Sequence, residues 1–140
     1  MFKFYLTGLM KFSTKAEYGL RAMTSLALCY PEVKSIKDIS IEEKISAKYL
    51  ERLMNELRKE KLVKSYKGKS GGYTLSKSSN KIRVGEIIQT LEGPLDLRGC
   101  NSNKCSSKKC LSKKVWIELE KQMNKTLNKI KLSDLIKGSK

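Results

Sequence analysis

The sequence predicts a mainly α-helical fold that carries one small β-hairpin. Apolar residues recur at helical spacing in several stretches, which indicates amphipathic helices with one buried face each. Serines stand immediately before two of these stretches, where their hydroxyls can cap a helix. A basic, glycine-rich run lies between two short β-prone segments, which is typical of a hairpin. The order of these signals along the 140 residues defines the architecture.

A first short helix is predicted to begin at Ser35. This serine stands three residues before Asp38, as in a capping box. It is also followed by Ile36, Ile39 and Ile41, which we interpret as the apolar side of a short amphipathic helix.

A second helix is predicted after Ser46, which can cap it. Its buried face consists of Leu50, Leu53, Met54 and Leu57. The opposite face is polar and consists of Lys48, Glu51, Arg52, Asn55, Arg58 and Lys59. Two short helices joined by a turn form a helix-turn-helix, in which the second helix enters the DNA major groove.

The hairpin follows this helix pair directly. Its β-prone pieces, Leu62-Val63 and residues 73–75, flank a turn rich in lysine and glycine. From residue 61 to residue 83 the chain has seven basic side chains and no acidic one. A solvated lysine-rich surface would also explain this charge. Its coincidence with a hairpin beside a helix-turn-helix favours a DNA-binding wing, so we predict a winged helix-turn-helix.

Two more helices flank this unit, and a long one ends the chain. The first follows a cap at Ser13 or Thr14 and ends near Cys29, before Pro31, and another covers residues 84–91. We interpret Cys29 as a buried core cysteine rather than as a metal ligand.

The last helix is predicted over residues 111–130. Its apolar positions are Val115, Leu119, Met123, Leu127 and Ile130. So much apolar surface on a small domain requires a partner, and a twin helix in a homodimer is the economical arrangement. A helix that folds back over its own domain is the alternative.

We therefore expect three parts: an N-terminal extension over residues 1–9, a DNA-binding domain over residues 10–82, and a cysteine loop with a dimerisation helix over residues 83–140. The first nine residues are too short for a signal peptide and lack a small-residue cleavage site. No apolar run approaches the roughly 20 residues that span a bilayer. We expect a cytoplasmic protein that does not bind membranes.

The composition agrees with a polyanionic partner. Thirty Lys+Arg against 14 Asp+Glu give a formal net charge of +16. Such an excess favours nucleic acid through counterion release, without separating DNA from RNA or from an acidic membrane. The chain has no histidine, and no nucleophile–base pair or phosphate loop occurs in it, so we do not expect an enzyme.

Three cysteines stand close together before the last helix. Cys100, Cys105 and Cys110 are separated by two equal four-residue gaps in a polar stretch. In an intracellular chain such thiols favour metal ligation or redox chemistry over structural disulfides. Thiolates select zinc, copper(I) or iron–sulfur clusters. Three thiols leave a four-ligand site incomplete. A carboxylate, another cysteine, a backbone or solvent ligand, or a group from a second subunit remains possible as the fourth.

Several blocks of sequence match one known family in order and spacing. They are Lys11–Lys15, Tyr18–Met23, Ile45–Glu51, Leu57–Lys59, Leu62–Ser65, Gly68–Leu75, Val84–Ile88 and Leu91–Pro94. Through these blocks the chain resembles the Rrf-two family of winged-helix transcriptional regulators over residues 10–135. The resemblance implies a homodimer with crossed long helices. It also implies that the dimer binds a roughly palindromic double-stranded DNA operator in two successive major grooves.

The resemblance assigns DNA contacts to the second helix and the wing. The corresponding positions are Ser46, Lys48, Tyr49, Glu51, Arg58, Lys59, Lys67, Lys69, Gly71 and Gly72. A carboxylate at Glu51 can accept a hydrogen bond from cytosine N4, whereas lysines suit phosphate or minor-groove contacts. Core packing is the alternative role for Tyr49, and turn geometry is the alternative for the two glycines.

The resemblance also implies an iron–sulfur cluster, 2Fe-2S rather than 4Fe-4S, on Cys100, Cys105 and Cys110. Two departures stand out, since the cysteine gaps are slightly shorter than usual and Lys113 stands where some members have a histidine ligand. Other members complete the cluster with a carboxylate from the partner's first helix. Glu17 occupies that position here, and an ordinary exposed glutamate is the alternative reading of this residue.

Together these observations predict a dimeric regulator, most simply a repressor, that senses iron–sulfur, redox or nitric-oxide status through the cluster. The alternative is a cluster-free regulator of cysteine or sulfur metabolism. It would be gated by a regulatory partner protein or by thiol oxidation, for example a reversible Cys105–Cys110 disulfide. A zinc-stabilised RNA-binding or adaptor protein belongs to a third class, which the missing aromatic stacking platforms disfavour.

Overall fold

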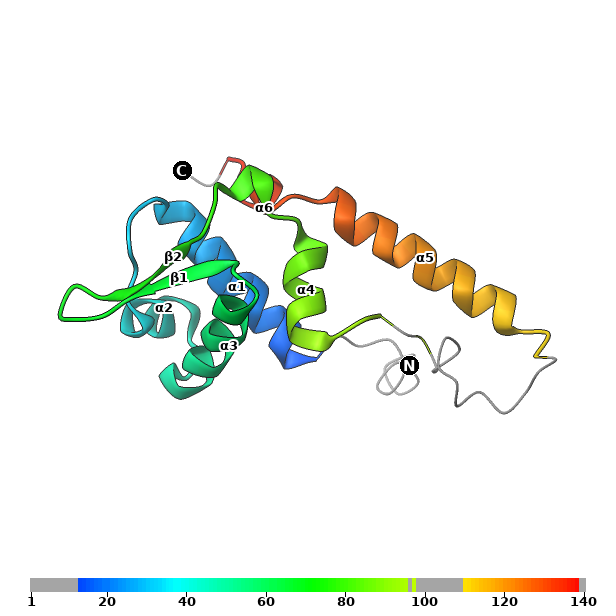
Figure 1. The fold of residues 1–140 in the computed structure, drawn as a ribbon, viewed down its shortest axis with the longest axis horizontal. Helices are drawn as coiled ribbons and strands as arrows, with labels where there is room; N and C mark the ends of the chain where they lie inside the picture. The colour runs from blue at the N-terminus through cyan, green and yellow to red at the C-terminus, as the bar shows by residue number, and fades with distance from the viewer. Residues whose placement is uncertain (1–12, 96, 98–109, 139–140) are drawn as a thin grey trace, which may run out of the picture.

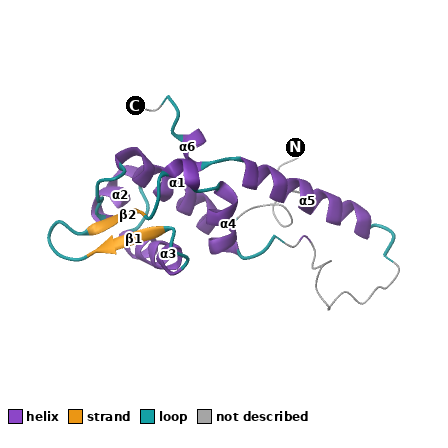
Figure 2. Ribbon diagram, turned by 45° about the horizontal axis from the view of Figure 1, so that its top comes forward, coloured by secondary structure: helices purple, strands orange, loops and turns teal. Residues whose placement is uncertain are grey.

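The computed structural model describes residues 13–95, 97 and 110–138 (Figure 1). The helices are α1 (Thr14–Cys29), α2 (Ile36–Glu43), α3 (Ala47–Lys59), α4 (Val84–Glu92), α5 (Lys113–Lys129) and α6 (Leu132–Leu135), and η1 (Ser79–Lys81) is a short 3-10 helix. The strands are β1 (Val63–Tyr66) and β2 (Gly72–Leu75). The predicted mainly helical fold with one β-hairpin is confirmed (Figure 2). The expected extension over residues 1–9 lies outside the described residues.

The core lies where α1, α3 and α4 meet. The predicted apolar face of α3 is completely buried, and its members are Leu50, Leu53, Met54 and Leu57. Met23 and Leu26 of α1 and Ile87 of α4 belong to the same buried cluster. Burial of apolar surface stabilises a fold by about 25 cal/mol per Å², so this cluster holds α3 in one rotational setting.

Both predicted serine caps of the helix-turn-helix are confirmed. Ser35 Oγ accepts a hydrogen bond from the Asp38 backbone N–H at 3.0 Å, and Ser46 Oγ accepts one from the Tyr49 N–H at 3.2 Å. Each bond satisfies a donor that the first turn of a helix leaves without an intrahelical partner.

The expected apolar side of α2 is only partly correct. Ile39 is fully buried, whereas Ile41 is 66% exposed. Two residues along a helix correspond to a rotation of about 200°, so a side chain two positions after a buried one lies on the opposite face. Ile36, three positions before Ile39, packs against the core as expected.

The wing is a two-stranded antiparallel hairpin with Val63 opposite Leu75. Lys34 extends it by one residue of a third strand: the Lys34 N–H donates to the Tyr73 carbonyl at 2.9 Å, and the Tyr73 N–H donates to the Lys34 carbonyl at 2.8 Å. Gly72 lies at this crossing with a φ of +153°, and a Cβ there would come within 2.2 Å of the Lys34 carbonyl oxygen. Glycine therefore permits the close approach of the two backbones.

Helix α5 projects away from the bundle of α1 to α4, and the chain then returns to that bundle through α6 (Figures 1 and 2). Leu127 and Ile130, at the end of α5, pack on the small cluster that contains Ala16 and Val84. Leu132 of α6 is fully buried in the main core. The sequence did not predict α6, because four residues are too few for a periodic pattern. The division of the chain near residue 82 stays a prediction.

Among the helices within the described ranges, none combines the length and the apolar character that crossing a membrane requires.

Candidate nucleic-acid interface

Helix α3 presents a polar face to the solvent. Its exposed positions, with the N-cap, are Ser46, Ala47, Lys48, Glu51, Arg52, Arg58 and Lys59. Because the leucines on the opposite face are held in the core, these side chains point outward. Lys48 and Glu51 lie in the first part of the helix, which is the part that contacts base edges in a helix-turn-helix.

Tyr49 lies on the side of α3 that contacts α1. Its ring meets the ring of Tyr18 edge to face, with centroids 5.8 Å apart and planes at 84°. The Arg21 guanidinium lies 5.5 Å from the centroid of the Tyr18 ring. Such aromatic and cation–π contacts stabilise a fold by about 1 kcal/mol each. They support a packing role for the half-buried Tyr49, and its DNA contact stays a prediction.

Asn55 orients Arg58 on the exposed face of α3. The Arg58 Nη2 donates to the Asn55 Oδ1 at 2.8 Å, one turn earlier on the same helix. Asn55 was not among the site residues predicted from the sequence. The signal was present, because residues three apart on a helix are neighbours on its surface.

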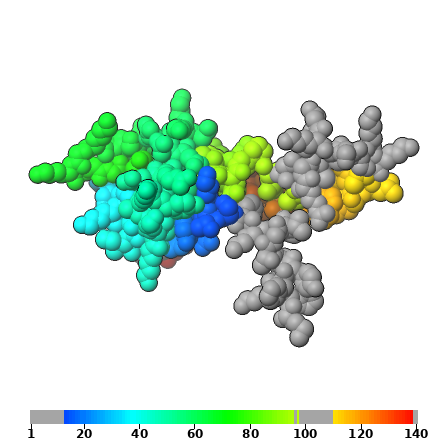
Figure 3. Space-filling view, turned by 90° about the horizontal axis from the view of Figure 1, so that it is seen from below, coloured from blue at the N-terminus to red at the C-terminus, as the bar shows by residue number. Residues whose placement is uncertain are grey.

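The wing carries Lys67 and Lys69 at its exposed end. Figure 3 shows the wing projecting beside α3 on one face of the molecule. A Cβ on Gly71 would come within 2.4 Å of the Tyr66 carbonyl oxygen, so backbone geometry requires glycine there as it does at Gly72. The turn-geometry interpretation of both glycines is thus supported, and their contact with DNA stays a prediction.

The cations around α1 are engaged in ion pairs, in contrast to those of the interface. Lys15 pairs with Glu56 at 3.1 Å, and the Arg21 Nε pairs with Glu43 at 3.0 Å. For Lys48 and for both wing lysines, no ion pair occurs within the described residues. These lysines therefore contribute positive charge where phosphates would approach.

Of the three cysteines predicted to hold a cluster, Cys110 is described, whereas Cys100 and Cys105 lie outside the described residues. The Ser112 hydroxyl lies 3.2 Å from the Cys110 sulfur, and this hydrogen bond lowers the pKa of the Cys110 thiol below its ordinary value. The backbone at residues 112–113 acts in the same direction. A lowered pKa favours the thiolate, which is the form that binds metals.

Glu17 is exposed in the first turn of α1. Its carboxylate is therefore accessible to another subunit. Within the part of the chain that the structure describes, no group of three metal-ligating side chains occurs. Three thiolates and a carboxylate fit an iron–sulfur cluster by their donor chemistry, since thiolates bind iron and sulfide clusters readily. The complete ligand set stays a prediction.

Cys29 is half-buried rather than fully buried, and its sulfur lies within hydrogen-bonding distance of the Leu26 and Glu32 carbonyl oxygens, at 3.5 and 3.7 Å. The predicted full burial of Cys29 in the core is therefore not observed, and its structural rather than metal-binding role stays a prediction.

Comparison with known proteins identifies the family. Residues 12–138 match the family model Rrf2, described as an iron-dependent transcriptional regulator. The regulator IscR of Pectobacterium carotovorum is 35% identical over 130 residues, which cover 91% of this chain and 79% of that protein. The structure of T. potens IscR is similar with a TM-score of 0.78 and 36% identity, and the match covers 94% of this chain and 89% of that one.

A second solved structure extends the comparison. CymR, the global cysteine regulator of B. subtilis, is similar with a TM-score of 0.77 and 33% identity over 91% of this chain and 96% of that one. The match over nearly the whole chain agrees with the winged helix-turn-helix described above. The chain therefore belongs to the Rrf2 family and is a winged-helix, DNA-binding transcriptional regulator rather than an enzyme.

Proposed function

We propose that this regulator binds a palindromic operator as a homodimer and represses transcription. The observation that carries this proposal is the placement of the exposed α3 face beside the basic wing (Figure 3). In each subunit Glu51 would accept a hydrogen bond from a base edge, while Lys48 and the wing's Lys67 and Lys69 would contact phosphates. Ser46, Tyr49, Arg58 and Lys59 would complete the contact along the helix.

Binding to DNA upstream of its own gene, measured by fluorescence anisotropy over a range of salt concentrations, tests this interface. Replacing Lys67 and Lys69 together by alanine is expected to reduce the slope of log K against log salt by about 0.9 for each lost phosphate contact. Glu51→Gln is expected to change base preference at one operator position by about 1–3 kcal/mol. Lys137→Ala, at an exposed position outside α3, α5 and the wing, is the control. An unchanged slope in the wing variant, or equal affinity for structured RNA, would contradict the proposal.

Helix α5 would form the dimer interface. Within the described chain none of its residues is fully buried, and Val115 and Ile117 are 60% and 39% exposed. A shallow hollow that includes Met123 and Leu127 lies on the same helix. A twin helix would bury this surface through interdigitated side chains. Sedimentation is expected to give twice the chain mass of 15.9 kDa, and Ile117→Lys is expected to give monomers.

The proposed sensor is an iron–sulfur cluster, 2Fe-2S in preference to 4Fe-4S, held by Cys100, Cys105 and Cys110 of one subunit and Glu17 of the other. Supporting observations are the lowered pKa of the Cys110 thiol and the exposure of Glu17. A bound cluster would supply an iron centre that reacts with oxidants and nitric oxide.

Helix α5 connects Cys110 to the DNA-binding unit. The Cys110 carbonyl accepts from the Lys113 N–H at 3.2 Å, at the start of α5. At the other end of α5, the Arg83 guanidinium donates to the Asn128 carbonyl at 2.8 Å and the Val84 N–H donates to the Ile130 carbonyl at 2.9 Å. A structural change at the cysteines would thus alter the relative position of the two α3 helices in the dimer. Because DNA fixes the half-site spacing, operator affinity would change.

The test is a visible absorption spectrum of protein purified without oxygen, with iron and sulfide assays on the same sample. Broad visible bands that disappear in Cys110→Ala are expected. Glu17→Ala is expected to shorten the lifetime of the bands without unfolding the protein, whereas Glu32→Ala, at another exposed glutamate, is expected to leave them unchanged. An unaltered lifetime in Glu17→Ala would exclude the carboxylate as a ligand.

The second candidate is a cluster-free regulator of cysteine or sulfur metabolism, gated by thiol oxidation or by a partner protein. Its support is the similarity to CymR, which is nearly as close as the similarity to IscR. A colourless, metal-free protein that still binds its promoter would favour this candidate. A colourless protein that contains zinc would instead indicate a structural zinc site.

A further inference from the structure

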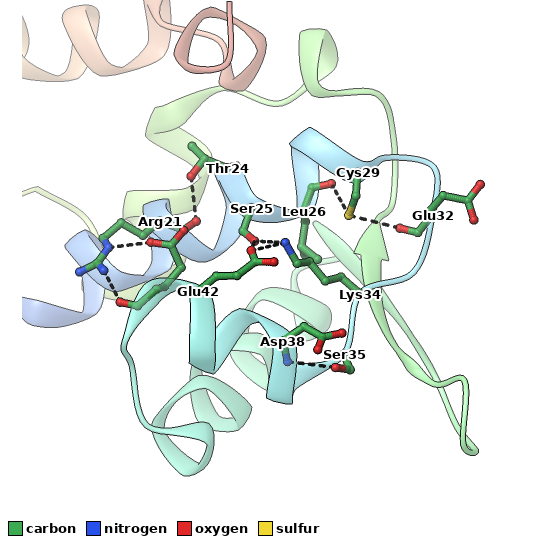
Figure 4. A network of polar contacts seen from close by, with 11 residues as sticks. Arg21, Thr24, Ser25, Leu26, Cys29, Glu32, Lys34, Ser35, Asp38 and Glu42 are labelled. Carbon is green, nitrogen blue, oxygen red and sulfur yellow. Dashed lines mark hydrogen bonds and ion pairs between the residues drawn. The ribbon is translucent and has the colours of Figure 1, made fainter. Parts of the chain in front are cut away.

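Lys34 lies between α1 and α2 and contacts both helices as well as the wing. Its backbone forms two hydrogen bonds with Tyr73 of β2, at 2.9 and 2.8 Å. Its side chain is 16% exposed, and its ammonium group donates to the Ser25 hydroxyl of α1 at 2.9 Å and to the Glu42 carboxylate of α2 (Figure 4). Lys34 therefore connects the wing to α1 and to α2.

The three side chains form a closed hydrogen-bonded group. Ser25 is 2% exposed, and its hydroxyl donates to the Glu42 carboxylate at 3.4 Å while it accepts from Lys34. Within the described residues, no buried side-chain nitrogen or oxygen lacks a hydrogen-bond partner. Hydrogen bonds between charged groups are stronger than neutral ones, and a low exposure strengthens them further.

The wing depends on such an attachment. A two-stranded hairpin is marginally stable by itself. Its outer residues, 64–70, are all exposed, so its orientation is decided at its base. There Val63 and Leu75 are buried, the Thr74 hydroxyl donates to the Pro31 carbonyl at 3.3 Å, and Lys34 pairs with the backbone of β2.

We propose that Lys34 is a positioning residue for DNA binding, which sets the orientation of the wing relative to α3 through its contacts with Ser25 and Glu42. A direct phosphate contact by Lys34 is disfavoured by the geometry. Its ammonium group would have to leave both partners to reach a phosphate. This inference rests on the proposed role of Lys67 and Lys69, since those are the groups that the wing would present.

A double-mutant cycle on operator affinity tests the inference. Lys34→Met keeps the aliphatic stem and the backbone pairing but removes the ammonium group. Lys37→Met removes an identical charge from an exposed position of α2 and is the matched control. The combined variant Lys67→Ala with Lys69→Ala reports how much the wing contributes in each background.

Lys34→Met is expected to weaken operator binding about fivefold, and Lys37→Met less than about twofold. The wing variant is expected to reduce operator affinity about tenfold in the wild type but only about twofold in the Lys34→Met background. The effect is smaller there because a misplaced wing already contributes less to DNA binding. Amide hydrogen exchange at Lys34 and Tyr73 is expected to accelerate about tenfold in Lys34→Met, since local opening becomes easier.

The outcomes distinguish a failure of the proposed wing function from a failure of the proposed role of Lys34. If the wing variant costs nothing in the wild type, the proposed function of the wing fails, and this inference fails with it. If the wing variant costs affinity but its effect adds to that of Lys34→Met, only the inference fails, and Lys34 acts independently of the wing.

Two further variants keep the test decisive. Lys34→Arg retains the cation and is expected to keep affinity within about twofold of the wild type. An arginine variant as weak as Lys34→Met would overturn a role for the charge. If Lys34→Met does not fold, Glu42→Gln weakens the same ion pair from the more exposed side and replaces it in the cycle.

Discussion

Ser13 and Glu92 join the start of α1 to the end of α4. The Ser13 backbone N–H donates to the Glu92 carboxylate at 3.0 Å, and the Ser13 hydroxyl donates to the same oxygen. Ser13 occupies the N-cap position of α1, but its side chain makes no capping bond to that helix. A carboxylate from 79 positions later in the chain therefore supplies the negative charge that favours a helix N-terminus.

Removing this carboxylate is expected to destabilise the fold. Glu92→Ala should lower the free energy of unfolding by about 1 kcal/mol, which is typical for the loss of a helix-end interaction. Glu32→Ala, at an exposed glutamate of a loop, should change it by less than about 0.5 kcal/mol. Urea unfolding followed by circular dichroism measures both values, and equal effects would show that the Ser13–Glu92 contact contributes no stability.

A substitution on the buried face of α3 is expected to reduce the free energy of unfolding much more. Leu53 is completely buried, so Leu53→Ala should lower the free energy of unfolding by about 2–5 kcal/mol through lost burial and the cavity left behind. Leu28 on α1 is 52% exposed, and Leu28→Ala should cost below about 1 kcal/mol. Thermal and chemical unfolding provide the measurement. A similar cost at both positions would contradict the assignment of the core.

Alanine substitutions at Gly72 and Gly68 distinguish the effect of a close approach between two backbones from the effect of backbone strain alone. Both have a positive φ, of +153° and +105°, but only a Cβ on Gly72 meets backbone atoms, those of Lys34 and Ser35. Each alanine substitution should introduce strain of about 1–3 kcal/mol, and Gly72→Ala should exceed Gly68→Ala because it also separates Lys34 from the wing. Unfolding curves give the difference, and amide exchange at Tyr73 locates it. Equal losses would show that the close approach contributes nothing.

The thiol of Cys110 should react at a lower pH than an ordinary cysteine. The Ser112 hydroxyl lowers the pKa of this thiol, so the thiolate forms earlier as the pH rises. In metal-free protein that retains Cys110 alone, Ser112→Ala should move the midpoint of the alkylation rate to higher pH and slow the reaction at pH 7. Thr126→Ala, at another hydroxyl of α5, should leave the midpoint in place. An unshifted midpoint in Ser112→Ala would exclude the Ser112 hydroxyl as the cause of the lowered pKa of the Cys110 thiol.

The sequence was most informative where the interactions are local. The caps at Ser35 and Ser46 and the buried face of α3 follow from residues within one or two helical turns of each other. Helical periodicity and capping depend on neighbours in the chain, so they can be read without a structure. The prediction that Ile41 lies on the apolar side of α2 was wrong. It did not apply the helical spacing strictly, because that spacing places Ile41 opposite Ile39.

By itself, the sequence determined the winged helix-turn-helix, its family and the polar face of α3, because these depend on short-range patterns that the chain order preserves. Only the tertiary structure decided the roles of Lys34, Glu92 and Leu132. Each of these acts on a segment distant in sequence: Lys34 on β2, Glu92 on the start of α1, and Leu132 in the main core. Such contacts form only when the hydrophobic core has closed the intervening loops, and no local spacing encodes them.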